Sequence, residues 1–166
     1  LSLGNAEESK DKAEETLKYL VKNYPNEISE QAVAYTILGE AYLNIGRNDR
    51  ALEYLLQAES LFSNEASSDL AECYENLGII YWNNGNLDLS TQYHEKSLRI
   101  RENLFGKQSV EVADSYNNLG VINLGVDGFR AALYLGRAQD LYTQHYGENH
   151  PKVAFCLINL ANANTK

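Results

Sequence analysis

The sequence predicts an all-helical protein built from repeated helix pairs, and three observations lead to this fold class. Only two prolines interrupt the 166 residues, which favours long helices. Apolar residues recur at spacings of three and four, the period of one helix face. The segment from Gly106 to Ile122 is repeated, with substitutions, by the segment from Gly147 to Ala163, which begins 41 residues later. A fixed period of this length indicates a stacked array of structural repeats.

Three segments of the chain align on a Leu-Gly pair. The glycines are Gly39, Gly78 and Gly120, spaced 39 and then 42 residues apart, and Ala161 takes the equivalent place in a fourth copy. A small residue at a fixed place lets a neighbouring helix approach closely. A tyrosine stands four residues before each glycine and a leucine one residue before it: Tyr35, Tyr74 and Tyr116, and Leu38, Leu77 and Leu119.

Each copy continues into a second amphipathic helix. We expect its buried stripe to contain Ala51, Leu55, Ala58 and Phe62 in the first copy, Leu87, Ser90, His94, Ser97 and Leu98 in the second, and Phe129, Ala132, Leu135 and Ala138 in the third. An upstream half-copy carries Ala13, Leu17, Leu20 and Pro25. Because no such helix can bury its stripe alone, stacked neighbours must form one continuous core. We expect a local irregularity in the third copy, whose second helix is one residue short and which has Asn123 where the others have tyrosine.

The expected helices cover residues 5–23, 28–45, 48–62, 67–83, 87–103, 109–124, 129–145 and 150–164. Ser109 is expected to cap its helix, and Pro151 to begin the last one. This order gives a partial repeat over 1–25, repeats over about 28–63, 67–104 and 109–146, and a truncated repeat over 150–166. We expect the last helix to be marginal or to pair with another chain, since only the preceding hairpin can cover Leu157 and Leu160.

The signature Tyr-x2-Leu-Gly-x2-Tyr over residues 35–42, followed by Ala51 and Ala58, resembles the tetratricopeptide repeat. The spacing of about 42 residues and the segment YGENHPKVAFCLINLA resemble the long-repeat subclass typified by kinesin light chains. The resemblance covers nearly the whole chain. It implies a right-handed superhelical stack of antiparallel helix pairs, whose first helices line a concave groove that holds a peptide or protein partner.

The resemblance also implies which residues face that groove. They are Val33, Thr36, Ile37, Glu40 and Leu43 in the first copy, Glu72, Glu75, Asn76, Ile79 and Trp82 in the second, Asp114, Asn117, Asn118, Val121 and Leu124 in the third, and Phe155, Ile158 and Asn159 in the last. Asn76, Asn118 and Asn159 recur in register. A row of side-chain amides can both donate to and accept from an extended peptide backbone. The alternative is that these amides cap or bridge neighbouring helices.

The expected contacts to a partner are Asn76, Asn118, Asn159, Glu40, Glu75, Asn117, Ile79, Trp82 and Val121. Trp82, the sole tryptophan, either anchors a partner side chain or packs against the next repeat. Acidic residues on the first helices (Glu40, Glu72, Glu75 and Asp114) either favour an extended, neutral to basic peptide or form an ordinary solvated face.

Composition argues against several classes of partner. A net charge of −9 and a pI near 4.8 oppose binding to nucleic-acid phosphates and anionic membranes. The sequence contains no run of 18 apolar residues, which a membrane-spanning helix would require. Cys73 and Cys156 lie inside helical patterns, so we expect two buried free thiols and, from them, a reducing, cytoplasmic location.

No catalytic, metal or cofactor site is expected. His94 falls at a packing position, and the spacing of His145 and His150 matches no metal motif. Cys156 lies six residues beyond His150 but on a different helix face. The leading hypothesis is a protein-interaction module. Two alternatives remain. The resemblance implies that the chain could be a sensor or scaffold segment of a larger regulatory enzyme or signalling protein, and its open C-terminal helix suggests a module that self-assembles.

Overall fold

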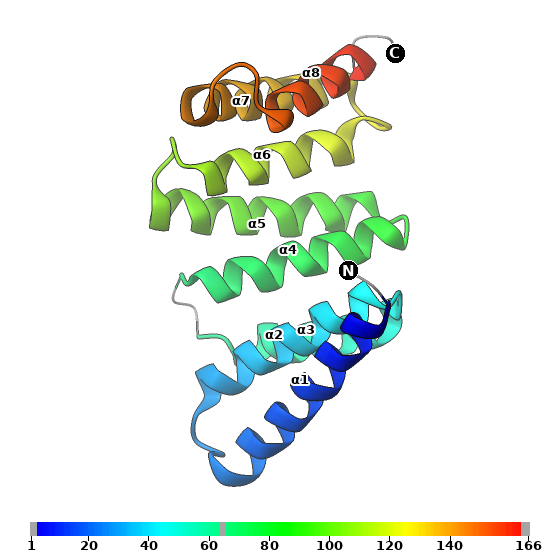
Figure 1. Ribbon diagram of the computed structural model, residues 1–166, viewed down its shortest axis with the longest axis vertical. Coiled ribbons are helices and arrows are strands. Elements are labelled where there is room, and N and C mark those ends of the chain that lie inside the picture. The colour runs from blue at the N-terminus through cyan, green and yellow to red at the C-terminus, as the bar shows by residue number, and fades with distance from the viewer. Residues whose placement is uncertain (1–2, 64–65, 164–166) are drawn as a thin grey trace. The chain divides into compact units, whose positions relative to one another are not determined.

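The computed structural model describes residues 3–63 and 66–163, and within them the protein is all-helical, with no strand (Figure 1). The eight helices found there are α1 (Leu3–Asn23), α2 (Ile28–Asn44), α3 (Asn48–Leu61), α4 (Ser68–Asn83), α5 (Leu87–Phe105), α6 (Val110–Asn123), α7 (Gly128–Tyr146) and α8 (Pro151–Ala163). Every predicted helix exists, and each predicted end lies within two residues of the observed one. The all-α fold class is confirmed.

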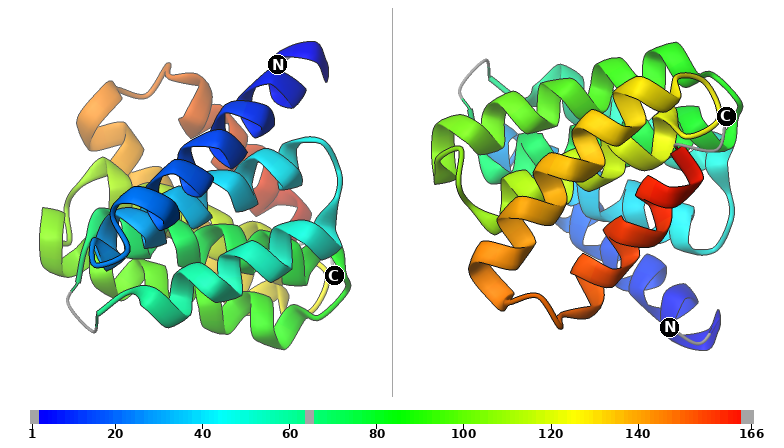
Figure 2. Two further views of the ribbon diagram at one scale, coloured as in Figure 1. Left: turned by 90° about the horizontal axis from the view of Figure 1, so that it is seen from below. Right: turned by 90° about the horizontal axis from the view of Figure 1, so that it is seen from above.

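The chain forms two compact units, Leu1–Asn86 with α1 to α4 and Leu87–Lys166 with α5 to α8. In unit 1, α2 packs against α1, α3 and α4, and α3 also packs against α4. In unit 2, α6 packs between α5 and α7, and α7 packs against α8. Figure 2 shows α7 and α8 running side by side in opposite directions. Each unit is therefore a stack of antiparallel neighbours.

The side chains of short polar residues cap the N-termini of several helices. The Ser109 hydroxyl accepts a hydrogen bond from the Val112 amide at 3.3 Å, and Ser67 caps α4 in the same way. These side chains satisfy amides that have no partner within the helix. The predicted cap at Ser109 is confirmed, and α8 begins at Pro151, as expected.

The turn between α6 and α7 differs from its two counterparts. Gly46 and Gly85 end the first helices of the earlier copies with φ angles of 75° and 76°, whereas no residue between α6 and α7 has a positive φ. Instead, the Asn123 side chain is buried and donates a 2.7 Å hydrogen bond to the Leu119 carbonyl. The predicted irregularity is confirmed, and a side chain takes part in ending the helix.

Two of the signature glycines, Gly39 and Gly120, lie where the two helices of a hairpin approach closely. A Cβ atom at Gly39 would lie 2.5 Å from Cγ of Leu55. One at Gly120 would also lie 2.5 Å from Cγ of Leu135, far inside van der Waals contact. Both leucines are fully buried. The interhelical distance in these hairpins therefore depends on the missing side chain.

The predicted stripe of the third copy is wrong in part. Phe129 is 82% exposed, and Ala132 is only partly buried. The buried stripe is Ala131, Leu135 and Ala138. Helix α6 ends three residues after Gly120, whereas α2 and α4 end five residues after Gly39 and Gly78, and the connection to α7 is one residue longer than its counterparts. Every position of α7 therefore moves back by one relative to an alignment on Gly120.

The last helix packs by one side only. Val153 and Cys156 are buried, and Leu160 packs against buried Ala131 and Leu135 of α7. Leu157, which we expected α7 to cover poorly, is 50% exposed. Residues 164–166, part of the predicted truncated repeat, lie outside the described residues.

Candidate partner-binding groove

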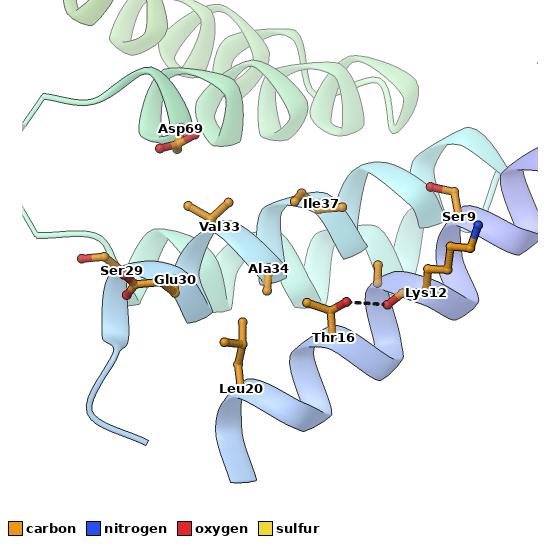
Figure 3. A pocket seen from close by; sticks show the side chains of 11 residues that line it. Ser9, Lys12, Thr16, Leu20, Ser29, Glu30, Val33, Ala34, Ile37 and Asp69 are labelled. Carbon is orange, nitrogen blue, oxygen red and sulfur yellow. Dashed lines mark hydrogen bonds between the residues drawn. The ribbon is translucent and has the colours of Figure 1, made fainter. Parts of the chain in front are cut away.

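Unit 1 contains an open, largely apolar groove between α1 and α2, with a volume of about 570 Å³ (Figure 3). Its residues come from three helices: Ser9, Lys12, Ala13, Thr16 and Leu20 from α1, Ser29, Glu30, Val33, Ala34 and Ile37 from α2, and Asp69 from α4. Ile37 is 47% exposed. Exposed β-branched and aliphatic side chains in a concave site favour an apolar ligand surface.

The groove keeps its shape because α1 is fixed along α2. Ala13 and Leu17 of α1 form a core cluster with Ala34 and Leu38 of α2. Nearby, the Tyr42 hydroxyl donates a 2.6 Å hydrogen bond to Glu14. That hydrogen bond, together with burial, raises the pKa of Tyr42 to about 12.

Two of the predicted groove residues, Val33 and Ile37, line this site, and others of the same helix do not. Thr36 is buried and donates to the Ala32 carbonyl at 3.0 Å. Glu40 and Leu43 are half-buried and lie outside the lining. The contribution of α1 to this groove was not predicted, because the upstream half-copy over residues 1–25 was interpreted only as a packing surface. The available signal was that this half-copy has a second-helix pattern without a first helix before it.

The predicted contacts on α4 differ widely in exposure. Trp82 is 47% exposed in the last turn of the helix, as an anchor requires. Glu75 and Ile79 are half-buried. Asn76 is 7% exposed, and its amide nitrogen is buried without a hydrogen-bond partner. Only Trp82 of this group presents a large accessible side chain.

In unit 2, the predicted acidic position Asp114 is paired. Its carboxylate accepts hydrogen bonds from Lys152 and from the hydroxyl of Tyr142, both at 2.5 Å. Burial first, and then this carboxylate, raise the pKa of Tyr142. Lys152 offsets the charge of Asp114, so the α6 wall is less acidic than the sequence predicts.

A second, smaller cavity of about 340 Å³ lies beside this pair. It is lined by Asp114, Asn117, Tyr142, Pro151, Lys152 and Phe155. The Cys156 thiol donates to the Asn117 amide oxygen at 3.7 Å, and burial raises the pKa of that thiol to about 11. Polar contacts between α6 and α8 therefore accompany the apolar cluster that includes Val112 of α6 and Val153 of α8.

The remaining predicted contacts of unit 2 are mostly covered. Asn118 and Val121 are half-buried. Asn159 is 8% exposed, and its amide nitrogen, like that of Asn76, is buried without a hydrogen-bond partner. Asn76 in unit 1 and Asn159 in unit 2 are therefore both buried, and the amide nitrogen of each has no hydrogen-bond partner.

His94 and the two cysteines lie in the core, as the sequence predicts, whereas His145, expected in a loop, lies in the last turn of α7. His94 is buried, which lowers its pKa to about 4, and His150 stacks on Tyr146 with ring centroids 4.3 Å apart. Cys73 and Cys156 are buried and free. Over residues 3–63 and 66–163, no group of three or more His, Cys, Asp or Glu side chains could hold a metal ion. No helix in the same ranges has the length and apolar character to cross a membrane.

Two family models match the chain, both described as tetratricopeptide repeat, over residues 32–65 and 69–137. Among curated proteins, the clustered mitochondria protein homolog of Coccidioides immitis is 27% identical over 145 residues, which cover 81% of this chain and 11% of that protein. The homolog from Neosartorya fischeri is 27% identical over 135 residues, covering 75% of this chain and 10% of that protein. The chain spans about a tenth of the length of these relatives.

Solved structures share the fold over nearly the whole chain. BtubC (BKLC) from P. vanneervenii has a TM-score of 0.87 and 26% sequence identity, with coverage of 98% of this chain and 66% of that one. Kinesin light chain TPR-like repeats from Podosopora anserina have a TM-score of 0.80 at 19% identity, with coverage of 98% and 79%. These repeats resemble the kinesin light chain type, as the sequence predicts.

Proposed function

Because the chain belongs to the tetratricopeptide repeat family, whose repeats are protein–protein interaction modules, we propose that it binds a protein partner in the groove between α1 and α2. One observation carries this proposal. Leu20, Val33 and the 47% exposed Ile37 line one concavity of about 570 Å³. Covering such a surface gains hydrophobic free energy of roughly 25 cal/mol per Å² of apolar area.

The groove chemistry favours a ligand segment with a row of apolar side chains. Its floor and walls include Leu20, Val33 and Ile37, and its charged groups, Lys12, Glu30 and Asp69, have both signs. A neutral to basic partner agrees with the net charge of −9. A long acidic segment would be repelled by the protein as a whole.

The register asparagines supply a second, finer part of the proposal. The buried amide nitrogens of Asn76 and Asn159 have no hydrogen-bond partner, and a buried unpaired donor costs free energy. A carbonyl from an extended partner would remove that cost after a small local shift. In unit 1 the proposed contacts also include Glu40, Glu75, Ile79 and the exposed Trp82. In unit 2 they also include Asn117, Asn118 and Val121.

The role proposed here is non-catalytic, as is usual for scaffolds of this fold. Since the chain spans about a tenth of the curated relatives, a sensor or scaffold segment within a larger regulatory protein is the alternative. The buried free thiols of Cys73 and Cys156 fit the cytoplasmic, reducing location that the sequence predicts.

The test is a peptide-library screen, read by fluorescence anisotropy, on wild type and two variants. Ile37→Glu places a charge in the groove, and Leu56→Glu makes the same change at a comparably exposed site on α3, outside it. We expect Ile37→Glu to weaken binding of the hits by about tenfold or more and Leu56→Glu to leave it unchanged. Hits that bind both variants equally would exclude the groove.

A further inference from the structure

One side of α7 presents large apolar side chains to solvent. Phe129 is 82% exposed and Leu133 is 49% exposed, and Val126, between α6 and α7, is 62% exposed. Continuing along the helix at intervals of four, four and three residues, this side carries Phe129, Leu133, Arg137 and Asp140. We call these four residues, together with Val126, the α7 outer face. It is apolar in its first half and charged in its second.

The same places in the second helices of the earlier copies are polar. Matching buried Leu55 of α3 and His94 of α5 to Leu135 of α7 aligns the three helices. The four places then hold Asp49, Glu53, Gln57 and Ser60 in α3, and Asp88, Gln92, Lys96 and Arg99 in α5. All eight residues are exposed, and those of α5 are exposed although α7 follows α5 in the same unit. A following repeat therefore does not cover this side of a second helix, and the exposure of Phe129 and Leu133 is a property of the position.

Gly136 is a second feature of α7 that packing inside the protein does not explain. It follows Leu133 by three residues and precedes Asp140 by four, at the edge of the outer face. A Cβ atom at Gly136 would meet no atom of another helix within 4 Å. Glycine weakens a helix relative to alanine, and the matching residues of α3 and α5 are Leu56 and Glu95. A glycine at this place lets the axis of a partner helix approach closely.

The charged half of the outer face borders a pocket of about 400 Å³. Its lining comes from α5, the loop after it, α6 and α7, and includes Glu102, Lys107, Gln108, Tyr116, Arg137 and Asp140. All of these elements belong to unit 2, so the pocket lies between neighbouring helices of one compact unit. The apolar half of the outer face therefore leads into a site with charged groups of both signs.

Arg137 is oriented in this pocket by Tyr116. Its Nη1 donates a 3.1 Å hydrogen bond to the Tyr116 hydroxyl, and its guanidinium lies 5.4 Å from the centroid of that ring. The Tyr116 ring is itself buried, and its hydroxyl donates to Glu102 at 3.2 Å. Within the described residues, Arg137 forms no ion pair, and its side chain is exposed. A guanidinium fixed in this way binds a carboxylate through two N–H groups with little loss of side-chain entropy.

The other charged groups of the pocket also favour an acidic ligand group. Lys107 is a second cation that forms no ion pair in the described part of the chain. Of the two carboxylates, Glu102 already accepts a hydrogen bond from Tyr116, whereas no contact within residues 3–63 and 66–163 orients Asp140. A carboxylate ligand therefore meets a preoriented donor, and a cationic ligand would depend on an unoriented acid.

The order of charges along α7 opposes a second copy of the chain as the partner. From one end of the outer face to the other, the charged residues are negative, positive, positive and negative: Asp127, Arg130, Arg137 and Asp140. Two α7 helices packed through Leu133, whether parallel or antiparallel, would place like charges opposite each other. The net charge of −9 on each copy acts in the same direction. The charge pattern therefore favours a different protein.

From these observations we infer that the α7 outer face binds an amphipathic helix of a different protein. Two apolar side chains of that helix, one turn apart, cover Phe129 and Leu133, and Gly136 lets the helix axes approach. An acidic side chain about one turn further enters the pocket, where Arg137 and Lys107 bind its carboxylate. This surface is separate from the α1–α2 groove, so it adds a second binding site to the proposed function.

The test is a display library of helical peptides about 16 residues long, with two leucines one turn apart and the other positions randomised. Hits selected on the full chain are measured by fluorescence anisotropy on wild type and variants. Phe129→Asp and Leu133→Glu introduce the residues that α3 carries at these places, so the fold accommodates them. Leu56→Glu, at a residue 41% exposed on α3, is the matched control. Circular dichroism of each variant verifies that it is folded.

We expect hits that Phe129→Asp and Leu133→Glu each weaken by about tenfold or more and that Leu56→Glu leaves unchanged. An acidic residue should recur about one turn from the leucine pair. Arg137→Gln should weaken these acidic hits by about tenfold and leave unchanged the versions that have glutamine in place of the acid. Asp140→Asn should tighten binding of the acidic hits by about threefold, because it removes a like charge.

Two results from the screen would overturn the inference: no hit that depends on Phe129 and Leu133, or acidic hits that Arg137→Gln weakens no more than their glutamine versions. A recurrent basic residue, with binding that Asp140→Asn weakens, would overturn it as well. So would sedimentation velocity that shows wild type to self-associate through Phe129. Hits that Ile37→Glu weakens and Phe129→Asp does not would support the α1–α2 groove alone, so the two proposals fail independently.

Discussion

Replacing Gly120 with alanine tests whether the hairpin spacing depends on a missing side chain. The added Cβ would lie 2.5 Å from Cγ and 2.9 Å from Cδ2 of Leu135, and 3.2 Å from that residue's backbone nitrogen. Cγ is not the free end of a side chain, and the backbone nitrogen moves only with α7. Relief therefore requires α6 and α7 to separate, and overpacking of this kind costs about 1–3 kcal/mol.

A second effect of Gly120→Ala has the opposite sign. Alanine is more favourable than glycine inside a helix by about 0.5–1 kcal/mol. Gly136→Ala provides the matched control, because Gly136 lies within α7 and a Cβ there would meet no atom within 4 Å. Both variants gain the same helix propensity. The difference between their unfolding free energies is therefore the overpacking cost at Gly120.

We expect Gly136→Ala to be stabilised by about 0.5–1 kcal/mol and Gly120→Ala to be less stable than Gly136→Ala by about 1–3 kcal/mol. Urea unfolding followed by circular dichroism measures both at equilibrium. In a thermal scan, each kcal/mol corresponds to about 2–4 °C for a chain of this length. Equal stability of the two variants would refute the close approach of α6 and α7 at this glycine.

Three further predictions follow from charge and burial. Acidic C-terminal peptides should not bind, because Glu40 and Glu75 stand where chaperone-type arrays of this family hold the terminal carboxylate with basic residues. Saturable binding of such a peptide in an anisotropy titration would contradict this prediction. Burial lowers the pKa of His94 to about 4, whereas its pKa in the unfolded chain is about 6.5. As the pH falls from 6.5 to 4, the unfolded chain therefore binds a proton before the folded protein does. Stability should decrease across that window by up to about 3 kcal/mol, and urea titrations of His94→Gln should lack this part of the loss. Burial raises the pKa of Cys73 to about 12 and of Cys156 to about 11, so a thiol reagent at about pH 8 should label neither until the protein is unfolded; mass spectrometry of the native protein checks this.

Local features of the sequence determined the helices. The Leu-Gly period, the cap at Ser109 and Pro151 at the start of α8 specify where each helix begins and which residues share a face. The signature glycines also predict the close pairs, because a small residue is needed wherever two helix axes come near. Such signals act within one or two turns, so they can be recognised without knowing the neighbours.

Tertiary structure decided which of these faces are open. Ile37 and Asn76 hold equivalent places in the repeat, yet only Ile37 is exposed, because exposure depends on the helix that packs alongside. The Asp114 carboxylate likewise pairs with Lys152, which lies 38 residues further along the chain. The position of Phe129 was mispredicted because α6 ends early, and the one-residue deficit between Gly120 and α7 shifts every later side chain around the helix. Burial and electrostatics arise from contacts between distant segments, and periodicity within a helix carries no record of those contacts.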